Sequence, residues 1–267
     1  MRIFAVGDIH GAYLALKQVL EKVEFDVTKD KLVVLGDVCD GYTDTYEVIE
    51  YLMHLRSINP DNIITIMGNH DKWFYDWLKT NSLIFAAPQM WFNQGGKNTF
   101  NSYVRNGVMD SAGYVLYDEV VRKHLTYFKQ CLLFHIEDNM GFVHGGFTSP
   151  KGLGHEASES NYYWDRELIQ TARARMIHEQ VGVETMNKDL VAWFKAATGA
   201  HSKIFIGHTC TQFLRQGDEP FKVFNIIDLD TGAGHGERLT LMNVETEEYV
   251  QSDRVAELYP NVLNPRG

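Results

Sequence analysis

The 267-residue sequence predicts an α/β fold in which residues from most of the chain meet at one site. Five short apolar runs have strand length and β-branched or aliphatic content, and each leads directly into glycine or a possible metal ligand. The runs cover residues 3–6, 32–35, 63–67, 141–143 and 204–206. Because open α/β sheets keep their sites outside the carboxyl ends of the strands, we expect the five run ends to meet at one sheet edge.

Segments with helical periodicity separate the first three predicted strands. Residues 12–23 and 46–55 carry apolar side chains near helical spacing, and Pro60-Asp61-Asn62 breaks the chain before the third strand. Strands that alternate with helices imply right-handed crossovers and therefore a largely parallel start to the sheet.

The rest of the chain supplies two insertions and a strand-rich end. Helix-rich insertions are expected at about residues 72–130 and 160–200, where they would form a cap that walls the pocket and selects the substrate. Residues 221–250 are expected to form antiparallel strands that close a second sheet. Since the candidate ligands run from Asp8 to His208, we expect residues 1–267 to form a single domain.

The composition narrows the possible partners. A formal charge of −10 argues against a broad nucleic-acid-binding surface, because such surfaces depend on lysine and arginine. It leaves room for a small phosphorylated substrate, since two bound divalent ions would reverse the local field.

Three cysteines, an odd number with no paired spacing, favour a reducing cytoplasm. A secretory apolar segment and an 18-residue apolar run are both lacking in the sequence, so we expect a soluble cytoplasmic protein with no membrane partner.

Residues of metal-ligand type follow the predicted strands. A mixed set of carboxylates, an amide and imidazoles suits Mn²⁺, Fe²⁺ or Zn²⁺ better than Ca²⁺, and Asp37 could bridge two ions. Two ions about 3.5–4 Å apart generate hydroxide and hold a phosphoryl group for in-line displacement. A single histidine or an aspartate after glycine is usually structural, so the prediction depends on the whole set. The predicted ligands are Asp8, His10, Asp37, Asn69, His144 and His208.

The motifs around these residues resemble those of a known family. In order and spacing they match metallophosphoesterases of the phosphoprotein phosphatase type, in the calcineurin-like superfamily, over roughly residues 2–243. The bacterial and phage branch, with lambda-type protein phosphatases and symmetrical diadenosine tetraphosphate hydrolases, is the most similar. The resemblance implies a four-layer αββα sandwich with two divalent ions, Mn²⁺ foremost, at the carboxyl ends of the strands. The motifs are Gly7-Asp8-Ile9-His10-Gly11, Gly36-Asp37-Val38-Cys39-Asp40, Gly68-Asn69-His70-Asp71, His144-Gly145-Gly146 and Gly207-His208-Thr209.

The resemblance also implies roles outside the metal ligands. His70 would be the general acid that protonates the leaving oxygen and Asp40 would orient it, which agrees with a histidine and a carboxylate at neighbouring strand ends. Arg166 matches an arginine that holds the phosphate oxygens, as a bidentate guanidinium can. Arg173 and Arg175, nearby on a predicted helix, would serve a solvated face.

The sequence departs from the family at Gly41, where most members have arginine. Unless Lys72, Lys97 or Arg105 replaces that charge, the loss favours diesters, cyclic phosphates or nucleotides over dianionic monoesters.

Two further features allow two interpretations each. Cys39 is either a buried small side chain or a redox-sensitive group near the metals, and the aromatic residues of 73–77 form either core or a surface that stacks a base.

We therefore expect a metal-dependent phosphoesterase. The leading hypothesis is attack on a phosphomonoester, in the manner of serine/threonine protein phosphatases, by a hydroxide that bridges the metals. The alternative is a nucleotide, dinucleotide, RNA-end or cyclic phosphodiesterase, and a non-catalytic binding scaffold is the third possibility. The partner would be a phosphoprotein or a nucleotide, and the sequence predicts no oligomeric state.

Overall fold

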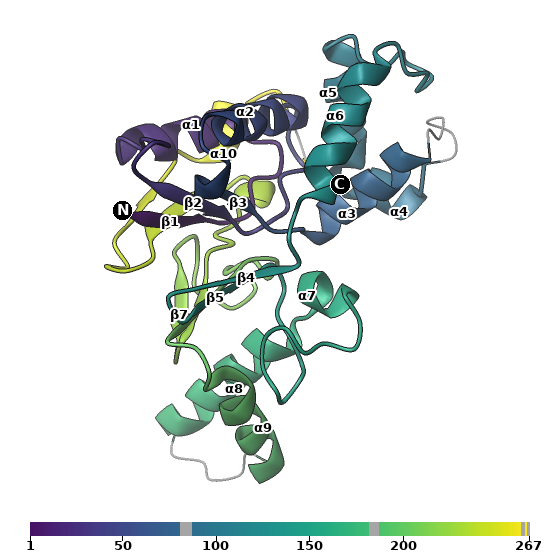
Figure 1. The fold of residues 1–267 in the computed structure, drawn as a ribbon. Helices are drawn as coiled ribbons and strands as arrows, with labels where there is room; N and C mark the ends of the chain where they lie inside the picture. The colour runs from purple at the N-terminus through teal and green to yellow at the C-terminus, as the bar shows by residue number, and fades with distance from the viewer. Residues whose placement is uncertain (81–86, 182–186, 263–264, 266–267) are drawn as a thin grey trace.

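Two five-stranded mixed sheets form the centre of the computed structural model, which describes residues 1–80, 87–181, 187–262 and 265 (Figure 1). The first sheet has the order β10-β9-β1-β2-β3. Its strands are β1 (Ile3–Val6), β2 (Lys31–Val34), β3 (Ile63–Thr65), β9 (Thr240–Asn243) and β10 (Tyr249–Gln251). The second sheet has the order β4-β5-β6-β8-β7. Its strands are β4 (Phe134–Glu137), β5 (Met140–Val143), β6 (Lys203–Ile206), β7 (Phe221–Val223) and β8 (Ile226–Asp228).

Helices cover the outer face of each sheet, so the predicted four-layer αββα arrangement is confirmed. In Figure 1, α1 (Tyr13–Lys22), α2 (Thr45–Ile58) and α10 (Val255–Leu258) lie over the first sheet, and α8 (Glu167–Val181) and α9 (Lys188–Thr198) lie beyond the second. No helix in the described ranges is long and apolar enough to cross a membrane.

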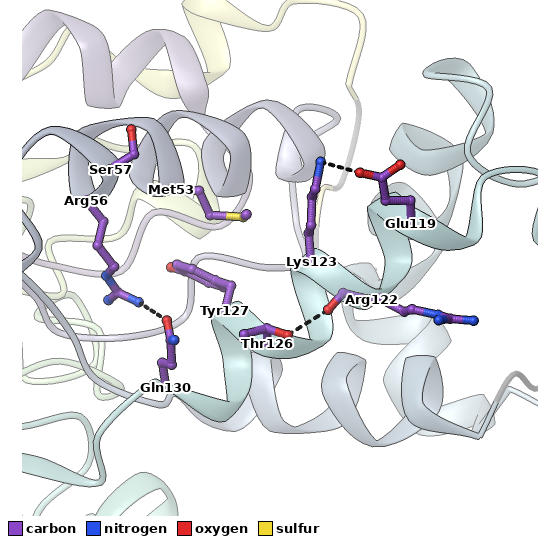
Figure 2. A pocket seen from close by; sticks show the side chains of 9 residues that line it. All are labelled: Met53, Arg56, Ser57, Glu119, Arg122, Lys123, Thr126, Tyr127 and Gln130. Atoms are coloured by element: carbon purple, nitrogen blue, oxygen red, sulfur yellow. Dashed lines mark hydrogen bonds and ion pairs between the residues drawn. The ribbon is translucent and has the colours of Figure 1, made fainter.

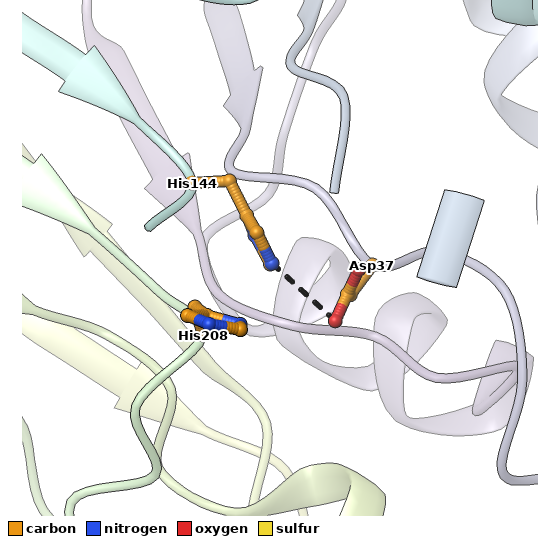
Figure 3. Close-up of side chains that lie close together, drawn as sticks. All are labelled: Asp37, His144 and His208. Atoms are coloured by element: carbon orange, nitrogen blue, oxygen red, sulfur yellow. Dashed lines mark ion pairs between the residues drawn. The ribbon is translucent and has the colours of Figure 1, made fainter. Parts of the chain in front are cut away.

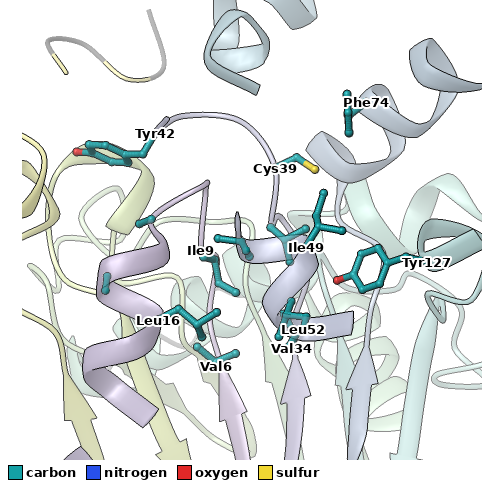
Figure 4. Packing of buried hydrophobic residues seen from close by; sticks show 14 of the residues in the cluster. Val6, Ile9, Leu16, Val34, Cys39, Tyr42, Ile49, Leu52, Phe74 and Tyr127 are labelled. Atoms are coloured by element: carbon teal, nitrogen blue, oxygen red, sulfur yellow. The ribbon is translucent and has the colours of Figure 1, made fainter. Parts of the chain in front are cut away.

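The alternation of side chains along the strands builds separate cores. Phe4 and Val6 of β1 pack into the cluster beneath α1 and α2, part of which Figure 4 shows, whereas Ala5 packs into the cluster between the sheets. Phe205 of β6 joins the same inter-sheet cluster, and its neighbour Ile204 packs towards α8 and α9. Because successive side chains point to opposite faces, strands of three or four residues can hold three layers of core together.

The first insertion is helix-rich, as expected. It contains α3 (Asn69–Lys79), α4 (Gln89–Trp91), the turn Phe92–Gly96, α5 (Lys97–Arg105) and α6 (Asp118–Lys129). Phe74 and Trp77 of α3 are buried in the core that these helices share, which supports the core interpretation for those two aromatic residues. The second insertion supplies α7 (Ser160–Trp164), α8 and α9. Residues 81–86 and 182–186, which fall inside the two expected insertions, lie outside the described residues. The single-domain organisation of 1–267 stays a prediction.

The prediction for residues 221–250 is partly wrong. β7 and β8 do join the second sheet as an antiparallel pair, but β8 also pairs in parallel with β6. β9 and β10 instead extend the first sheet, with β9 antiparallel to β1. β2 pairs with only one edge of β1, and β9 pairs with the backbone groups of the other edge. The apolar pattern of a segment can predict a strand, but it does not predict which of the two sheets that strand will join.

Phe74→Ala tests the core of the first insertion. Phe74 is fully buried among Trp77, Trp91, Tyr103 and Phe128, with ring centroids 5.1–6.1 Å away. We expect the free energy of unfolding to fall by about 3–5 kcal/mol, as for other large-to-small core changes. Chemical denaturation would measure it, with Tyr114→Ala as the control because Tyr114 is 59% exposed and should change stability by less than about 0.5 kcal/mol. Equal losses in both variants would contradict this description of the core.

Candidate metal and catalytic site

The predicted ligands meet between two sheets rather than at one edge of a single sheet, which corrects the sequence-based expectation. The loops after β1, β2 and β3 of the first sheet carry Asp8, His10, Asp37 and Asn69. The loops after β5 and β6 of the second sheet carry His144 and His208. All six residues are buried. The site therefore exists only where the carboxyl ends of the two sheets come together.

The backbone around these residues is constrained by close packing. His10, Asp37, Asp40 and His208 all adopt positive φ, between 48° and 69°, a region that non-glycine residues enter at a cost. At Gly68, a Cβ atom would lie 2.0 Å from the Asp37 carboxylate. Glycine before Asn69 is therefore required by the approach of the neighbouring loop.

One possible ion site consists of Asp8, His10 and Asp37, whose ligand atoms lie within 4.8 Å of one another. His10 Nε2 is 3.9 Å from Asp8 Oδ2 and 3.7 Å from Asp37 Oδ2. The other ring nitrogen, Nδ1, is 3.0 Å from the carbonyl oxygen of Cys39. A carbonyl accepts a hydrogen bond from protonated Nδ1, and this leaves Nε2 as the nitrogen that can bind a cation.

A second possible ion site consists of Asp37, His144 and His208, which point towards one another in Figure 3. His144 Nε2 lies 3.4 Å from Asp37 Oδ2 and 3.1 Å from Asn69 Oδ1, while its Nδ1 is 2.9 Å from the carbonyl oxygen of Leu35. His208 Nε2 is buried without a hydrogen-bond partner among the described residues. Asp37 belongs to both sites, as a bridging carboxylate would.

The electrostatics of the two sites fit bound cations. Burial, together with Asp230 and Asp37, raises the pKa of Asp8 well above its usual range. Burial also acts to raise the pKa of Asp37, but His144 and His70 hold it well below its usual range. Buried carboxylates without full compensation are costly, and a buried imidazole nitrogen without a partner has an open ligand position. The donor set of oxygen and nitrogen therefore fits two divalent ions of the borderline class.

His70 and Asp40 form a buried pair beside the metal-type ligands. His70 Nδ1 is 2.7 Å from Asp40 Oδ2, and the His70 ring lies 5.0 Å from the ring of His10. The Asp40 carboxylate also accepts hydrogen bonds from Trp91 Nε1, at 2.9 and 3.0 Å, and from Thr99 Oγ1, at 2.8 Å. Both oxygens are thus fixed in orientation, which in turn fixes His70. The paired arrangement expected from the sequence is present.

Three supporting residues were not assigned from the sequence. No local pattern in the sequence indicates the contact of Trp91 and Thr99 with Asp40. The third is Asp71, whose Oδ1 accepts from the backbone amides of Val38 and Cys39 and whose Oδ2 accepts from that of Gly68. It ties the loop after β2 to the start of α3. Its position directly after Asn69 and His70 was the available signal.

Cys39 lies in that same loop and is fully buried. Burial, with Asp71 and Asp40 nearby, raises the pKa of its thiol well above the usual range. This favours the small buried side chain over the redox-sensitive group, because thiolate formation is what makes a cysteine reactive.

Arg166 lies next to the second possible ion site. Its Nη1 donates to the carbonyl oxygen of His208 at 2.9 Å and to Thr209 Oγ1 at 3.0 Å. Arg173 instead donates to the carbonyl oxygen of Leu214, and Arg175 pairs with Glu179. The choice of Arg166 over its two neighbours is consistent with these positions.

A side chain at position 41 would be strained by the backbone conformation and tightly packed against His10. The φ of Gly41 is +91°, and a Cβ atom there would lie 3.0 Å from both the Cβ and the carbonyl oxygen of His10. Two of the possible substitutes for the missing charge are already paired, Lys72 with Asp76 and Arg105 with Asp44 and Glu47.

An aromatic wall connects the two insertions across the site. Trp73 of α3 lies 5.1 Å from His70 and 5.0 Å from Trp164 of α7, measured between ring centroids. Trp164 lies 5.8 Å from His208 and is 42% exposed. Helices from both insertions therefore border the site, which agrees with the expected walls.

Figure 2 shows a separate groove of 430 Å³ between α2 and α6. Met53 and Tyr127 line it together with Arg56, Arg122 and Lys123. None of the predicted site residues lines this groove, so the metal chemistry predicted from the sequence belongs elsewhere.

Comparison with known proteins defines the class. The family described as calcineurin-like phosphoesterase matches residues 1–229, and this chain belongs to that family. It is a hydrolase of phosphoester bonds in a family that uses divalent metals. The resemblance drawn from the five motifs is confirmed.

Particular relatives share one name. A symmetrical bis(5'-nucleosyl)-tetraphosphatase from Pseudomonas fluorescens (strain SBW25) is 26% identical to this chain, over 93% of each protein. A protein of the same name from Nitrosospira multiformis is 39% identical over 55% of this chain and 44% of the relative.

Solved structures share the fold. A crystal structure of a putative diadenosine tetraphosphatase has a TM-score of 0.57 and 18% identity, covering 94% of this chain and 92% of its own. A serine/threonine phosphatase from Saccharomyces cerevisiae has a TM-score of 0.58 and 15% identity, covering 95% of this chain and 80% of its own. Identities this low establish the fold alone.

Mn²⁺ should stabilise the metal-free protein. A ligand that binds only the folded state adds about 2.7 kcal/mol at a hundred times its Kd, so the unfolding temperature should rise on Mn²⁺ addition. Asp37→Asn should remove most of that rise, because both possible ion sites use Asp37. Differential scanning fluorimetry would measure it, with the exposed Asp253→Asn as the control. The metal assignment would be wrong if Mn²⁺, Fe²⁺ and Zn²⁺ all left the unfolding temperature unchanged.

Proposed function

We propose that this enzyme hydrolyses dinucleoside polyphosphates at a two-metal site. The observation that carries the proposal is Asp37, which is shared by two sets of metal-type ligands in a chain that matches a bis(5'-nucleosyl)-tetraphosphatase over 93% of its length. The sequence alone placed phosphomonoesters first and nucleotides second. The named relatives favour the second.

The proposed metal ligands are the six residues predicted from the sequence. Asp8 and His10 would hold one ion, Asn69, His144 and His208 the other, and Asp37 both. When bound, the ions supply a hydroxide nucleophile at neutral pH and neutralise charge on the phosphoryl group. Mn²⁺ remains the first candidate, with Fe²⁺ and Zn²⁺ as alternatives that the same donors would accept.

His70 is the proposed general acid. Asp40 accepts a hydrogen bond from Nδ1 at 2.7 Å, so the imidazole is held in one orientation. The hydrogen bonds from Trp91 and Thr99 keep Asp40 in place. The need for a proton from His70 grows with the basicity of the leaving oxygen, so it is greatest for an alkoxide or phenolate and smaller for a nucleoside phosphate, whose second phosphate pKa is about 6.

Arg166 is the proposed phosphate-binding residue. Its contacts with His208 and Thr209 hold the guanidinium beside the second possible ion site. With Gly41 in place of a second arginine, the site offers fewer charges to a terminal dianionic phosphate. An internal phosphate of a polyphosphate chain carries less charge at the reacting group, so it suits this site better.

The phosphoprotein phosphatase reading remains the second candidate, because the metal-type ligands and the His70–Asp40 pair serve either substrate. The non-catalytic scaffold is disfavoured because that pair is intact. A cytoplasmic location is kept as a prediction from the three unpaired cysteines.

A direct substrate comparison tests the proposal. Mn²⁺-loaded enzyme should hydrolyse diadenosine tetraphosphate with a kcat/KM at least about tenfold above that for a phosphoserine peptide, because only the dinucleotide offers an internal phosphate. Chromatography of the products would measure the first reaction and phosphate release the second. Asp37→Asn should lose both activities. A preference for the phosphopeptide would reinstate the phosphomonoester hypothesis.

His70→Ala tests the general acid. We expect kcat for phenyl phosphate, whose phenolate leaving group has a pKa of about 10, to fall about 10²- to 10⁴-fold, the usual contribution of general acid–base catalysis. The fall for para-nitrophenyl phosphate should be much smaller, because nitrophenolate is far less basic and leaves without a proton. His54→Ala, an exposed histidine on α2, is the matched control. Equal losses on both substrates would remove His70 from this role.

A further inference from the structure

A pocket of 410 Å³ begins beside Arg166 and runs along α8. Its lining includes Thr209, whose Oγ1 accepts the hydrogen bond from Arg166. It also includes Gln170, Arg173, Ile177 and His178 of α8. These positions follow the spacing i, i+3, i+7 and i+8, so they form one face of the helix. Arg166, just before the helix begins, lies about one turn before Gln170.

The chemistry of the lining changes with distance from the metal-type ligands. Thr209, which accepts the hydrogen bond from Arg166, and Gln170 come first, and Arg173 follows one turn later. Beyond them lies an apolar end, where Ile177 on α8 is 39% exposed and Phe213 on the loop after β6 is 68% exposed. From Gln170 to His178 the helix rises about 12 Å, which gives the pocket a cationic end and an apolar end.

Two polar groups in the pocket have capacity for a ligand. Arg173 donates Nε to the carbonyl oxygen of Leu214, and its guanidinium pairs with no carboxylate within the described ranges. His178 Nδ1 is buried without a hydrogen-bond partner in the same part of the chain. A guanidinium without a carboxylate in a chain of net charge −10 is a site for an anion.

The loop that carries Phe213 is connected to the metal-type ligands. The ring of Phe213 meets the ring of His235 edge-on, with centroids 5.6 Å apart. His235 adjoins Gly234, where a Cβ atom would lie 2.3 Å from the imidazole of His10. Phe213 is therefore held at the border of the site, although most of its surface is exposed to solvent.

We infer that this pocket binds one nucleoside half of the substrate, with the phosphates at Arg166 and Arg173 and the base against Phe213. The inference rests on the proposed function and adds to it the place of the nucleoside. The order of charges matches a nucleoside diphosphate, which has its anionic groups at one end and a flat, largely apolar ring at the other. A volume of 410 Å³ lies within the range of pockets that bind small molecules, about 300–1,000 Å³. An exposed aromatic side chain can stack any base, so the pocket accepts a nucleoside without selecting one.

Competition against para-nitrophenyl phosphate hydrolysis tests the inference. Inhibition constants would be measured for ADP and for inorganic pyrophosphate, which carries the same phosphates without a nucleoside. The wild-type enzyme should bind ADP about 5- to 150-fold more tightly than pyrophosphate, the gain expected from stacking one base. Phe213→Ala should remove most of that advantage, and Phe213→Tyr, which keeps the ring, should restore it. Tyr114→Ala, an exposed aromatic residue on the first insertion, should leave the ADP-to-pyrophosphate ratio at the wild-type value.

The inference is overturned if wild-type enzyme binds ADP no better than pyrophosphate, or if Phe213→Ala weakens both ligands equally. This outcome is separate from the fate of the proposed function. An enzyme that hydrolyses para-nitrophenyl phosphate but not diadenosine tetraphosphate would refute the proposed function, while the ADP-to-pyrophosphate ratio would still decide whether the pocket binds a nucleoside.

Discussion

The enclosure of two carboxylates between two sheets is the constraint on which this structure depends. Asp8 and Asp37 are each about 1% exposed, and burial together with nearby carboxylates raises the pKa of Asp8 well above its usual range. Such a group needs a compensating positive charge or a proton, and the imidazoles of His10, His144 and His208 are aimed at the same volume. This set of carboxylate oxygens and imidazole nitrogens, which includes the unpartnered Nε2 of His208, fits divalent ions of the borderline class.

The rest of the fold serves to hold those donors. Backbone carbonyls of Cys39 and Leu35 set which nitrogens of His10 and His144 face inwards. Asp71 ties the loop after β2 to the start of α3, and Trp91 from the first insertion fixes Asp40. The first insertion thus positions the His70–Asp40 pair as well as bordering the site. Loss of core packing around Phe74 would reach the His70–Asp40 pair through Trp91, since Phe74 and Trp91 stack.

The sequence was sufficient for the parts of the site that are encoded locally. Ligands at strand ends, and the neighbouring His70, could be assigned because each strand and its final residues lie within a few positions of one another. The sheet that β9 joins could not be assigned from the sequence, because it depends on which strand has an unpaired edge. Thr99 was not assigned because its contact with Asp40 joins segments 59 residues apart. The relatives favour the nucleotide alternative over the leading phosphomonoester hypothesis, and the sequence could not rank the two because metal-binding motifs describe the reaction and not the group that carries the phosphate.

The most direct test of this account is the state of the metal in Mn²⁺-loaded protein. If Asp37 bridges two ions, metal analysis should give two Mn²⁺ per chain, and electron paramagnetic resonance should show an exchange-coupled pair. Asp37→Asn should abolish the coupling. One tightly bound ion per chain, or two ions without coupling in the wild-type protein, would contradict the shared ligand on which the proposed chemistry is built.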